Sequence, residues 1–131
     1  VKELLRAGFS IGSHSRDHPY FQKLKLSEQL DQVNTSLNFL IDRFSINYKA
    51  FAIPFNDLGL RKDFFDKLFT EVGINIYFGT GEMKRNEFSN NYQRFHLENR
   101  YANLFPMQVI KNKYSTTIFA ELKRKYTLHR H

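Results

Sequence analysis

Short apolar segments alternate with longer amphipathic segments over most of the chain, and this alternation constrains the fold more than any other feature. Apolar side chains recur at helical spacing over 27–44, with Ser27 as the expected N-cap, and again after 57–61. We therefore expect two helices, the second closed by Gly73. Their apolar stripes consist of Leu30, Val33, Leu37, Leu40, Ile41 and Phe44, and of Phe64, Phe65, Leu68, Phe69 and Val72.

The segments before, between and after these two helices are typical of β-strands. The first alternates apolar and polar side chains, and the second is apolar on both faces and ends at Pro54. A polar stretch at 80–92, rich in asparagine, predicts a loop before the last strand. We expect strands at 9–13, 50–53, 74–78 and 93–97.

Both ends of the chain have helical patterns. Residues 2–7 are typical of the last turns of a helix closed by Gly8, and no N-cap precedes them, so we expect that upstream sequence is missing. Pro106 fits the first turn of a C-terminal helix, which we expect to break near Tyr114 and to fray over 123–131.

The alternation of strands and helices predicts the α/β class, with a parallel sheet covered on both faces. A length of 131 residues allows one domain, and the 14 Phe can supply its core. No apolar run reaches membrane-spanning length, and the first residues do not read as a signal peptide. Without Cys the chain has no disulfide, and the sequence does not fix a compartment.

Two histidines, His14 and His18, lie four residues apart after the first expected strand, and Pro19 follows them. A pair at a strand end and in the following turn can hold one divalent metal ion if the two imidazoles converge. The alternative is that both are ordinary surface histidines near a turn. The pattern alone does not decide between the two.

The residues that flank this pair, and four later segments in the same order, resemble the polysaccharide deacetylase family (the NodB homology domain, carbohydrate esterase family 4). In that family a glycine and a hydrophobic strand lead into a His-Ser/Thr-x-x-His motif, as they do here. The resemblance covers roughly residues 3–98, and its first motif is the specific one. The matching segments are 7–19, 51–56, 72–74, 77–81 and 93–95.

The resemblance implies a partial (β/α) barrel that lacks its first strands, because only about four strands are expected here. It also implies removal of acetyl groups from an acetylated polysaccharide or oligosaccharide by metal-assisted hydrolysis. The metal would be zinc, with cobalt or nickel as alternatives that imidazole ligands also suit. Missing strands, or a second copy of the chain in a homo-oligomer, would cover the open edge of the sheet.

Residue by residue, the resemblance makes His14 and His18 the metal ligands. Ser15 between them could hold the turn through its hydroxyl. Pro54 and Phe55 match the substrate-binding segment, and the backbone N–H of Phe55 would stabilise the oxyanion. His96 is the only central candidate for a general acid, and its setting fits the family poorly.

The chain also departs from the family pattern. The paired aspartates of the first family motif, one a metal ligand and one the catalytic base, have no counterpart, since Glu3 is the only acidic residue before His14. Ala52 stands where many members have Arg, and Asn56 replaces the usual Gly. Asp17 is expected to face solvent or to cap the turn rather than to bind metal.

Two other functions remain open. The missing aspartates would suit a non-catalytic relative that binds glycan or a protein partner. A net charge of +7 and many aromatic residues would suit a basic nucleic-acid-binding module, if Tyr or Phe side chains lay exposed beside Lys and Arg on one face. Aromatic residues at helical spacing are expected in the core, and this argues against the second alternative.

Overall fold

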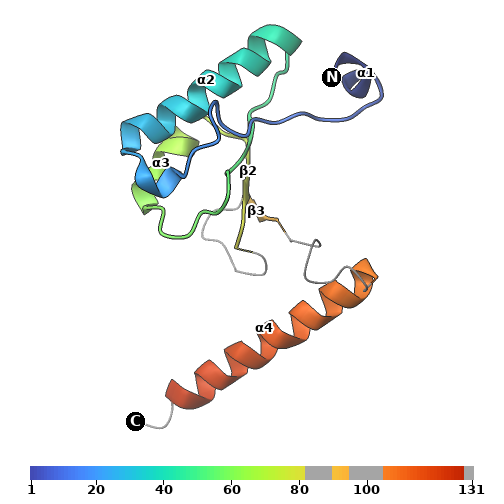
Figure 1. The fold of residues 1–131 in the computed structure, drawn as a ribbon, viewed down its shortest axis with the longest axis vertical. Helices are drawn as coiled ribbons and strands as arrows, with labels where there is room; N and C mark the ends of the chain where they lie inside the picture. The colour runs from blue at the N-terminus through green and yellow to red at the C-terminus, as the bar shows by residue number, and fades with distance from the viewer. Residues whose placement is uncertain (82–89, 95–104, 129–131) are drawn as a thin grey trace. The chain divides into compact units, whose positions relative to one another are not determined.

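The computed structural model describes residues 1–81, 90–94 and 105–128 (Figure 1). It consists of two compact units, residues 1–94 and 95–131, which are described separately here. The first unit contains the sheet and all the described residues that match the deacetylase motifs. The second contains one long helix.

A three-stranded parallel sheet with the order β1-β2-β3 forms the centre of the first unit. Its strands are β1 (Ala50–Ala52), β2 (Ile76–Gly79) and β3 (Asn91–Gln93). Phe51 is paired with Tyr77 in β2, and Tyr77 in turn with Asn91. The parallel pairing and the sequential strand order confirm the expected α/β class.

The first expected strand, over 9–13, is wrong except at its last residue. Ser13 alone forms a parallel bridge to Phe51, through its N–H to the Ala50 carbonyl (2.8 Å) and its carbonyl to the Ala52 N–H (2.9 Å). Phe9 is exposed and has no sheet partner among the described residues. Gly12 permits the approach, because a Cβ there would lie 3.0 Å from the Ala50 carbonyl oxygen.

Helices α2 (Leu26–Phe44) and α3 (Lys62–Thr70) lie side by side on one face of the sheet (Figure 1). Helix α2 begins one residue earlier than expected, and Ser27 is not its N-cap. The N-cap is Lys25, whose backbone N–H donates to the Glu28 carboxylate at 2.7 Å. A short 3-10 turn, η1 (Phe21–Lys23), precedes α2.

The expected apolar stripes form the core between these helices and the sheet. Val33, Leu37, Phe64 and Leu68 are fully buried, and they pack with Phe21, Phe51, Ile53 and Tyr77. Each such side chain contributes about 1.5–3 kcal/mol through removal of its apolar surface from water. This cluster therefore fixes the position of β1 relative to α2, between which the histidine segment is held.

The other face of the sheet differs from the expectation. Side chains along β2 alternate, with Tyr77 buried under the helices and Ile76 and Phe78 exposed by more than a third on the opposite face. Within the described residues of the first unit, the sheet is thus covered by helices on one face only. Helices on a single face are what one segment of a (β/α) barrel would have, but the described strands do not form a closed barrel.

The strand expected over 93–97 is observed instead as β3, which begins two residues earlier, inside the expected loop at 80–92. Residues 82–89 of that loop, and 95–97 of the expected strand, lie outside the described residues. Parallel pairing with β2 therefore overrides the turn-forming tendency of Asn91.

The helices at the two ends are α1 (Lys2–Arg6) and α4 (Pro106–Leu128). Helix α1 confirms the expected N-terminal helix, and Gly8 follows it with φ of 85°. Helix α4 begins at Pro106 as predicted but has no break at Tyr114, and it continues through the first six residues of the tail that was expected to fray. No described helix combines the length and the apolar character that crossing a membrane requires.

Candidate metal centre

His14 is positioned by the sheet. It follows Ser13, whose two backbone hydrogen bonds lock the segment onto β1. The imidazole Nδ1 of His14 lies 2.8 Å from the carbonyl oxygen of Ala52, the last residue of β1. A carbonyl can only accept, so Nδ1 carries the proton and Nε2 is left with a free lone pair. This is how a metal-binding histidine is usually oriented.

The turn between the two histidines is built from unusual backbone angles. Ser15 and His18 have φ of 71° and 52°, the left-handed region that residues with a Cβ rarely adopt. The Ser15 hydroxyl accepts a hydrogen bond from the His18 N–H at 3.0 Å, which confirms the expected role of Ser15 in holding the turn. As a result the His18 side chain turns back towards His14.

The two imidazoles converge. Their Nε2 atoms are 3.2 Å apart, and the ring planes are inclined by 64°. Two nitrogens bound to one tetrahedral zinc ion at 2.0–2.1 Å would be about 3.3 Å apart. Without metal, the same separation suits an N–H···N hydrogen bond from His18 to the free lone pair of His14. The pair therefore fits two neighbouring positions of one metal ion.

The histidine loop, residues 14–20, is also held by Gln32 of α2. The side chain of Gln32 is buried on the apolar face of the helix. Its Oε1 accepts hydrogen bonds from the backbone N–H groups of Arg16 (3.2 Å) and Asp17 (3.0 Å). Its Nε2 donates to the Asp17 carboxylate at 2.8 Å. These three hydrogen bonds fasten the loop to α2.

The same contacts account for Asp17. The hydrogen bond from Gln32, followed by the hydrogen bond and charge of Arg16, holds the pKa of the Asp17 carboxyl below its usual range. Arg16 also forms an ion pair with Asp31 at 3.0 Å. Asp17 is therefore engaged with Gln32 and Arg16 through its Oδ2. The described residues contain no cluster of three or more His, Cys, Asp or Glu that could hold a metal.

Phe55 lies beside the histidine pair. It follows Pro54, whose side chain is fully buried, and its φ of 55° turns it outwards, so that its ring is 42% exposed. Among the described residues, no acceptor is found for its backbone N–H. Pro54 is buried, so it can position Phe55 but is not accessible to a substrate. Of the two residues predicted to contact substrate, only Phe55 is exposed.

Two aromatic contacts connect Phe55 to the loop. Its ring packs against the imidazole of His18, with centroids 4.6 Å apart and planes inclined by 68°. The same ring is stacked on Tyr20, with centroids 4.0 Å apart and an interplanar angle of 10°. Asn56 is held by Gln22, whose side-chain amide donates to the Asn56 backbone carbonyl at 2.6 Å. The segment after β1 and the histidine loop are thus joined at three points.

The ends of the strands near Phe55 are tied together by polar groups. Asp57 accepts from the Thr80 hydroxyl at 2.7 Å and from the Tyr77 hydroxyl at 3.4 Å. Burial, and then the charge of Asp57, raise the pKa of Tyr77. The Arg94 guanidinium donates to the carbonyls of Gly79 (3.3 Å) and Ile53 (2.5 Å).

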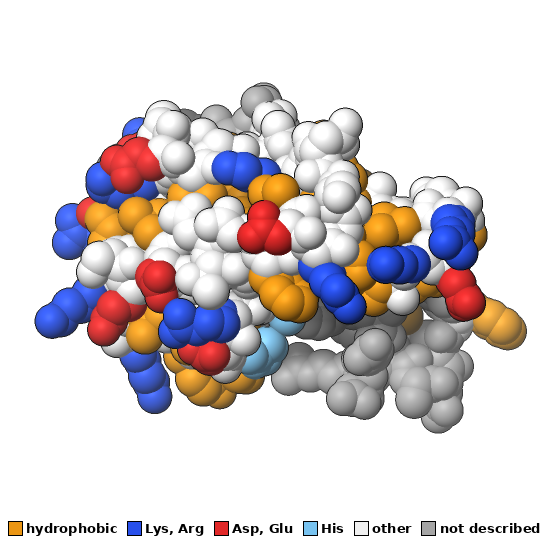
Figure 2. Space-filling view, turned by 90° about the horizontal axis from the view of Figure 1, so that it is seen from above, with side chains coloured by type: hydrophobic (Ala, Val, Ile, Leu, Met, Phe, Trp, Pro, Cys, Tyr) orange, Lys and Arg blue, Asp and Glu red, His pale blue; other side chains and the backbone are white. Residues whose placement is uncertain are grey.

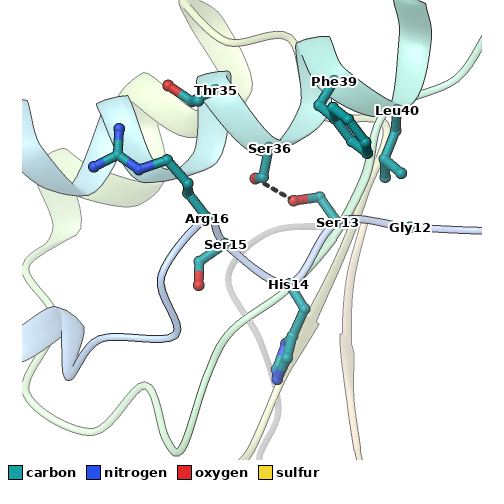
Figure 3. A pocket seen from close by; sticks show the side chains of 9 residues that line it. All are labelled: Gly12, Ser13, His14, Ser15, Arg16, Thr35, Ser36, Phe39 and Leu40. Carbon is teal, nitrogen blue, oxygen red and sulfur yellow. Dashed lines mark hydrogen bonds between the residues drawn. The ribbon is translucent and has the colours of Figure 1, made fainter. Parts of the chain in front are cut away.

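A cavity of about 370 Å³ lies between the histidine segment and α2 (Figure 3). Ser13 and Ser36 face each other on one side of it, with their hydroxyl oxygens 2.5 Å apart, and Phe39 and Leu40 lie on another. The ring of His14 points away from α2. His14 and Ser15 also line the cavity, whereas His18 does not.

Figure 2 shows histidine side chains at the molecular surface, beside hydrophobic ones. On this face Lys and Arg alternate with Asp and Glu, and no single-sign patch dominates. A metal or a substrate could reach the histidines from solvent, since both side chains are exposed. The face gives no support to a continuous basic surface of the kind that nucleic acid requires.

Several residues that build the site were not predicted. Gln32 and Ser36 interrupt the apolar stripe of α2, and this interruption was a visible signal of buried polar contacts. Tyr20 carried no such signal, because its contact with Phe55 depends on the tertiary fold. His96, the candidate general acid, lies outside the described residues.

One of the comparisons with known proteins gave a match. No curated protein and no solved structure was found to match the chain. The sequence model of the family described as polysaccharide deacetylase matches residues 1–71, which is 71 of the 131 residues and includes His14, His18 and Phe55. The chain therefore belongs to the polysaccharide deacetylase family.

Proposed function

We propose that this chain takes part in the metal-dependent removal of acetyl groups from an acetylated polysaccharide, with His14 and His18 as metal ligands. The observation that carries the proposal is the 3.2 Å separation of the two Nε2 atoms, together with the bond from His14 Nδ1 to the Ala52 carbonyl. Membership of the family supplies the reaction class and the polysaccharide substrate.

Zinc, with cobalt and nickel as alternatives, would polarise the acetyl carbonyl and lower the pKa of a bound water. Each histidine would contribute one ring nitrogen, and the Ala52 carbonyl, which accepts from Nδ1, orients the His14 ring so that Nε2 faces the metal. The backbone N–H of Phe55, for which the described residues provide no acceptor, would donate to the oxygen that becomes negatively charged when the carbonyl is attacked. Its position after a buried proline keeps this donor fixed before the substrate arrives.

A third ligand and a general base are needed in addition. Asp17 holds Gln32 and Arg16 through its Oδ2, and we assign neither of these two roles to it. In the family resemblance both come from an aspartate motif that precedes the histidine pair, where this chain has Glu3 and no Asp. Two imidazoles alone are expected to bind metal weakly.

Calorimetry with Zn²⁺ and Co²⁺ tests the proposal. The wild-type chain should bind one ion, and His14→Ala and His18→Ala should each abolish this binding. A variant that lacks the two tail histidines, His129→Ala/His131→Ala, is the matched control and should bind as the wild type does. Equal binding by the wild type and the His14 and His18 variants would contradict the proposed centre.

Acetate release from acetylated chito-oligosaccharides, measured with and without added Zn²⁺, tests the reaction itself. Metal-dependent release that disappears in His18→Ala would support hydrolysis by this chain. Metal binding without any release would instead indicate a relative that keeps the ligands and has lost turnover.

A further inference from the structure

The two ligands of the proposed metal centre are held in different ways. The ring of His14 is fixed by a hydrogen bond to the Ala52 carbonyl. The ring of His18 has no such support, since its only ring hydrogen bond within the described residues is to His14 itself. Its orientation depends on the ring of Phe55, against which it packs.

Phe55 is in turn fixed by Tyr20. The two rings are stacked nearly parallel, and the Lys23 ammonium lies 5.1 Å from the centroid of the Tyr20 ring. The Tyr20 ring thus contacts both the Phe55 ring and the Lys23 ammonium. His18, Phe55, Tyr20 and Lys23 thus form a continuous row of contacts, which we call the aromatic row.

The aromatic row joins two segments that are distant in the sequence. Tyr20 follows His18 closely, whereas Phe55 follows β1. Tyr20 and Phe55 are nearly half exposed, so apolar burial alone does not hold them. Stacked and edge-to-face ring contacts supply the specific geometry here.

We propose that Tyr20 is a positioning residue for the metal ligand His18 and acts through the ring of Phe55. The inference rests on the proposed function, because it concerns the same metal centre. An exposed imidazole with no second hydrogen bond would otherwise occupy several rotamers, and metal binding would have to select one of them. The aromatic row holds the His18 ring in one rotamer before the metal binds.

Co²⁺ affinity, measured by calorimetry on the whole chain, tests the proposal with three variants. Tyr20→Ala removes the stacked ring and should weaken binding about two- to tenfold, the range to which an aromatic pair corresponds. Tyr20→Phe keeps the ring and should restore wild-type affinity. Tyr114→Ala removes a tyrosine of similar exposure in the other unit and should have no effect.

A metal-free measurement is independent of how tightly the metal binds. In proton NMR spectra the ring protons of His18 should be shifted by the ring current of Phe55 and should show nuclear Overhauser contacts to it. Tyr20→Ala should reduce both signals, and Tyr20→Phe should keep them. The amide spectrum outside the loop should stay unchanged, which shows that the variant is folded.

The outcomes separate the two proposals. If His18→Ala loses Co²⁺ binding but Tyr20→Ala binds as the wild type does, the positioning role is refuted and the metal centre stands. If His18→Ala binds as the wild type does, the metal centre is refuted. If no binding is measurable in any variant, the NMR signals decide, and His18 protons unchanged in Tyr20→Ala refute the positioning role.

Discussion

Ser15 offers a test of how the histidine turn is held, because its two contributions can be separated by two substitutions. Its hydroxyl accepts a hydrogen bond from the His18 N–H, and its φ of 71° is strained for any residue with a Cβ. Ser15→Ala removes the hydrogen bond and keeps the strain. Ser15→Gly removes both.

The expected magnitudes follow from these two terms. The hydrogen bond is exposed, and its loss costs up to about 1 kcal/mol, so Ser15→Ala should lower the free energy of unfolding by up to that amount. The left-handed conformation costs a residue with a Cβ about 1–2 kcal/mol, and glycine avoids this cost. Glycine in turn loses about 0.5–1 kcal/mol of stability, because its unfolded chain has more conformational entropy to lose. Ser15→Gly should therefore lie within about 0.5 kcal/mol of the wild type.

Metal affinity should respond differently from stability. Both substitutions release the backbone of His18, so both should weaken Co²⁺ binding, by about fivefold if the full hydrogen bond is lost. Ser15→Gly should thus be nearly as stable as the wild type and still bind metal more weakly. Urea unfolding followed by circular dichroism gives the first quantity, and calorimetry gives the second.

Two results would refute this reasoning. If Ser15→Gly is destabilised as much as Ser15→Ala, the backbone at Ser15 is not strained in solution. If both variants bind Co²⁺ as tightly as the wild type does, the hydrogen bond to His18 does not help to hold the ligand.

Three further predictions concern the supports of the site. Gly12→Ala places a Cβ 3.0 Å from the Ala50 carbonyl oxygen, and it should lower the free energy of unfolding by about 1–3 kcal/mol in urea titrations. Gln32→Met leaves two backbone N–H groups without an acceptor and should cost about 1–3 kcal/mol in the same assay, whereas Asn38→Ala on the exposed face should change it by less than about 0.5 kcal/mol. The pKa of Tyr77 is raised in the folded state, so above pH 10 unfolding releases its proton. The free energy of unfolding of the wild type should therefore fall by up to about 1.4 kcal/mol per pH unit in this range, relative to Tyr77→Phe. Equal pH profiles of the two proteins would contradict this prediction.

The helices and the core could be predicted from the sequence because they depend on local periodicity. Leu37 in α2 and Phe64 in α3 each belong to an apolar stripe with helical spacing. Both side chains are fully buried in the core against the sheet. The strands were harder to predict, because pairing depends on distant partners. The segment 9–13 has a strand pattern but pairs only through Ser13, and β3 begins in an asparagine-rich stretch that favours turns.

The candidate site shows the same division. His14 and His18 could be identified from their spacing and flanks, and the turn explains why four residues suffice to bring their rings together. The groups that orient these rings could not be identified in this way. The carbonyl of Ala52 and the ring of Tyr20 act through contacts that exist only once β1, the loop and α2 have assembled.

The double attachment of the histidine segment to β1 has a consequence for how the protein opens. The Ala52 N–H donates to Ser13, and the carbonyl of the same residue accepts from the His14 ring. We expect the ligand and this amide to be released together when the histidine segment separates from β1. The hydrogen–deuterium exchange rate of the Ala52 amide should report how often the metal centre comes apart, and bound metal should slow that exchange by the factor that its binding free energy dictates.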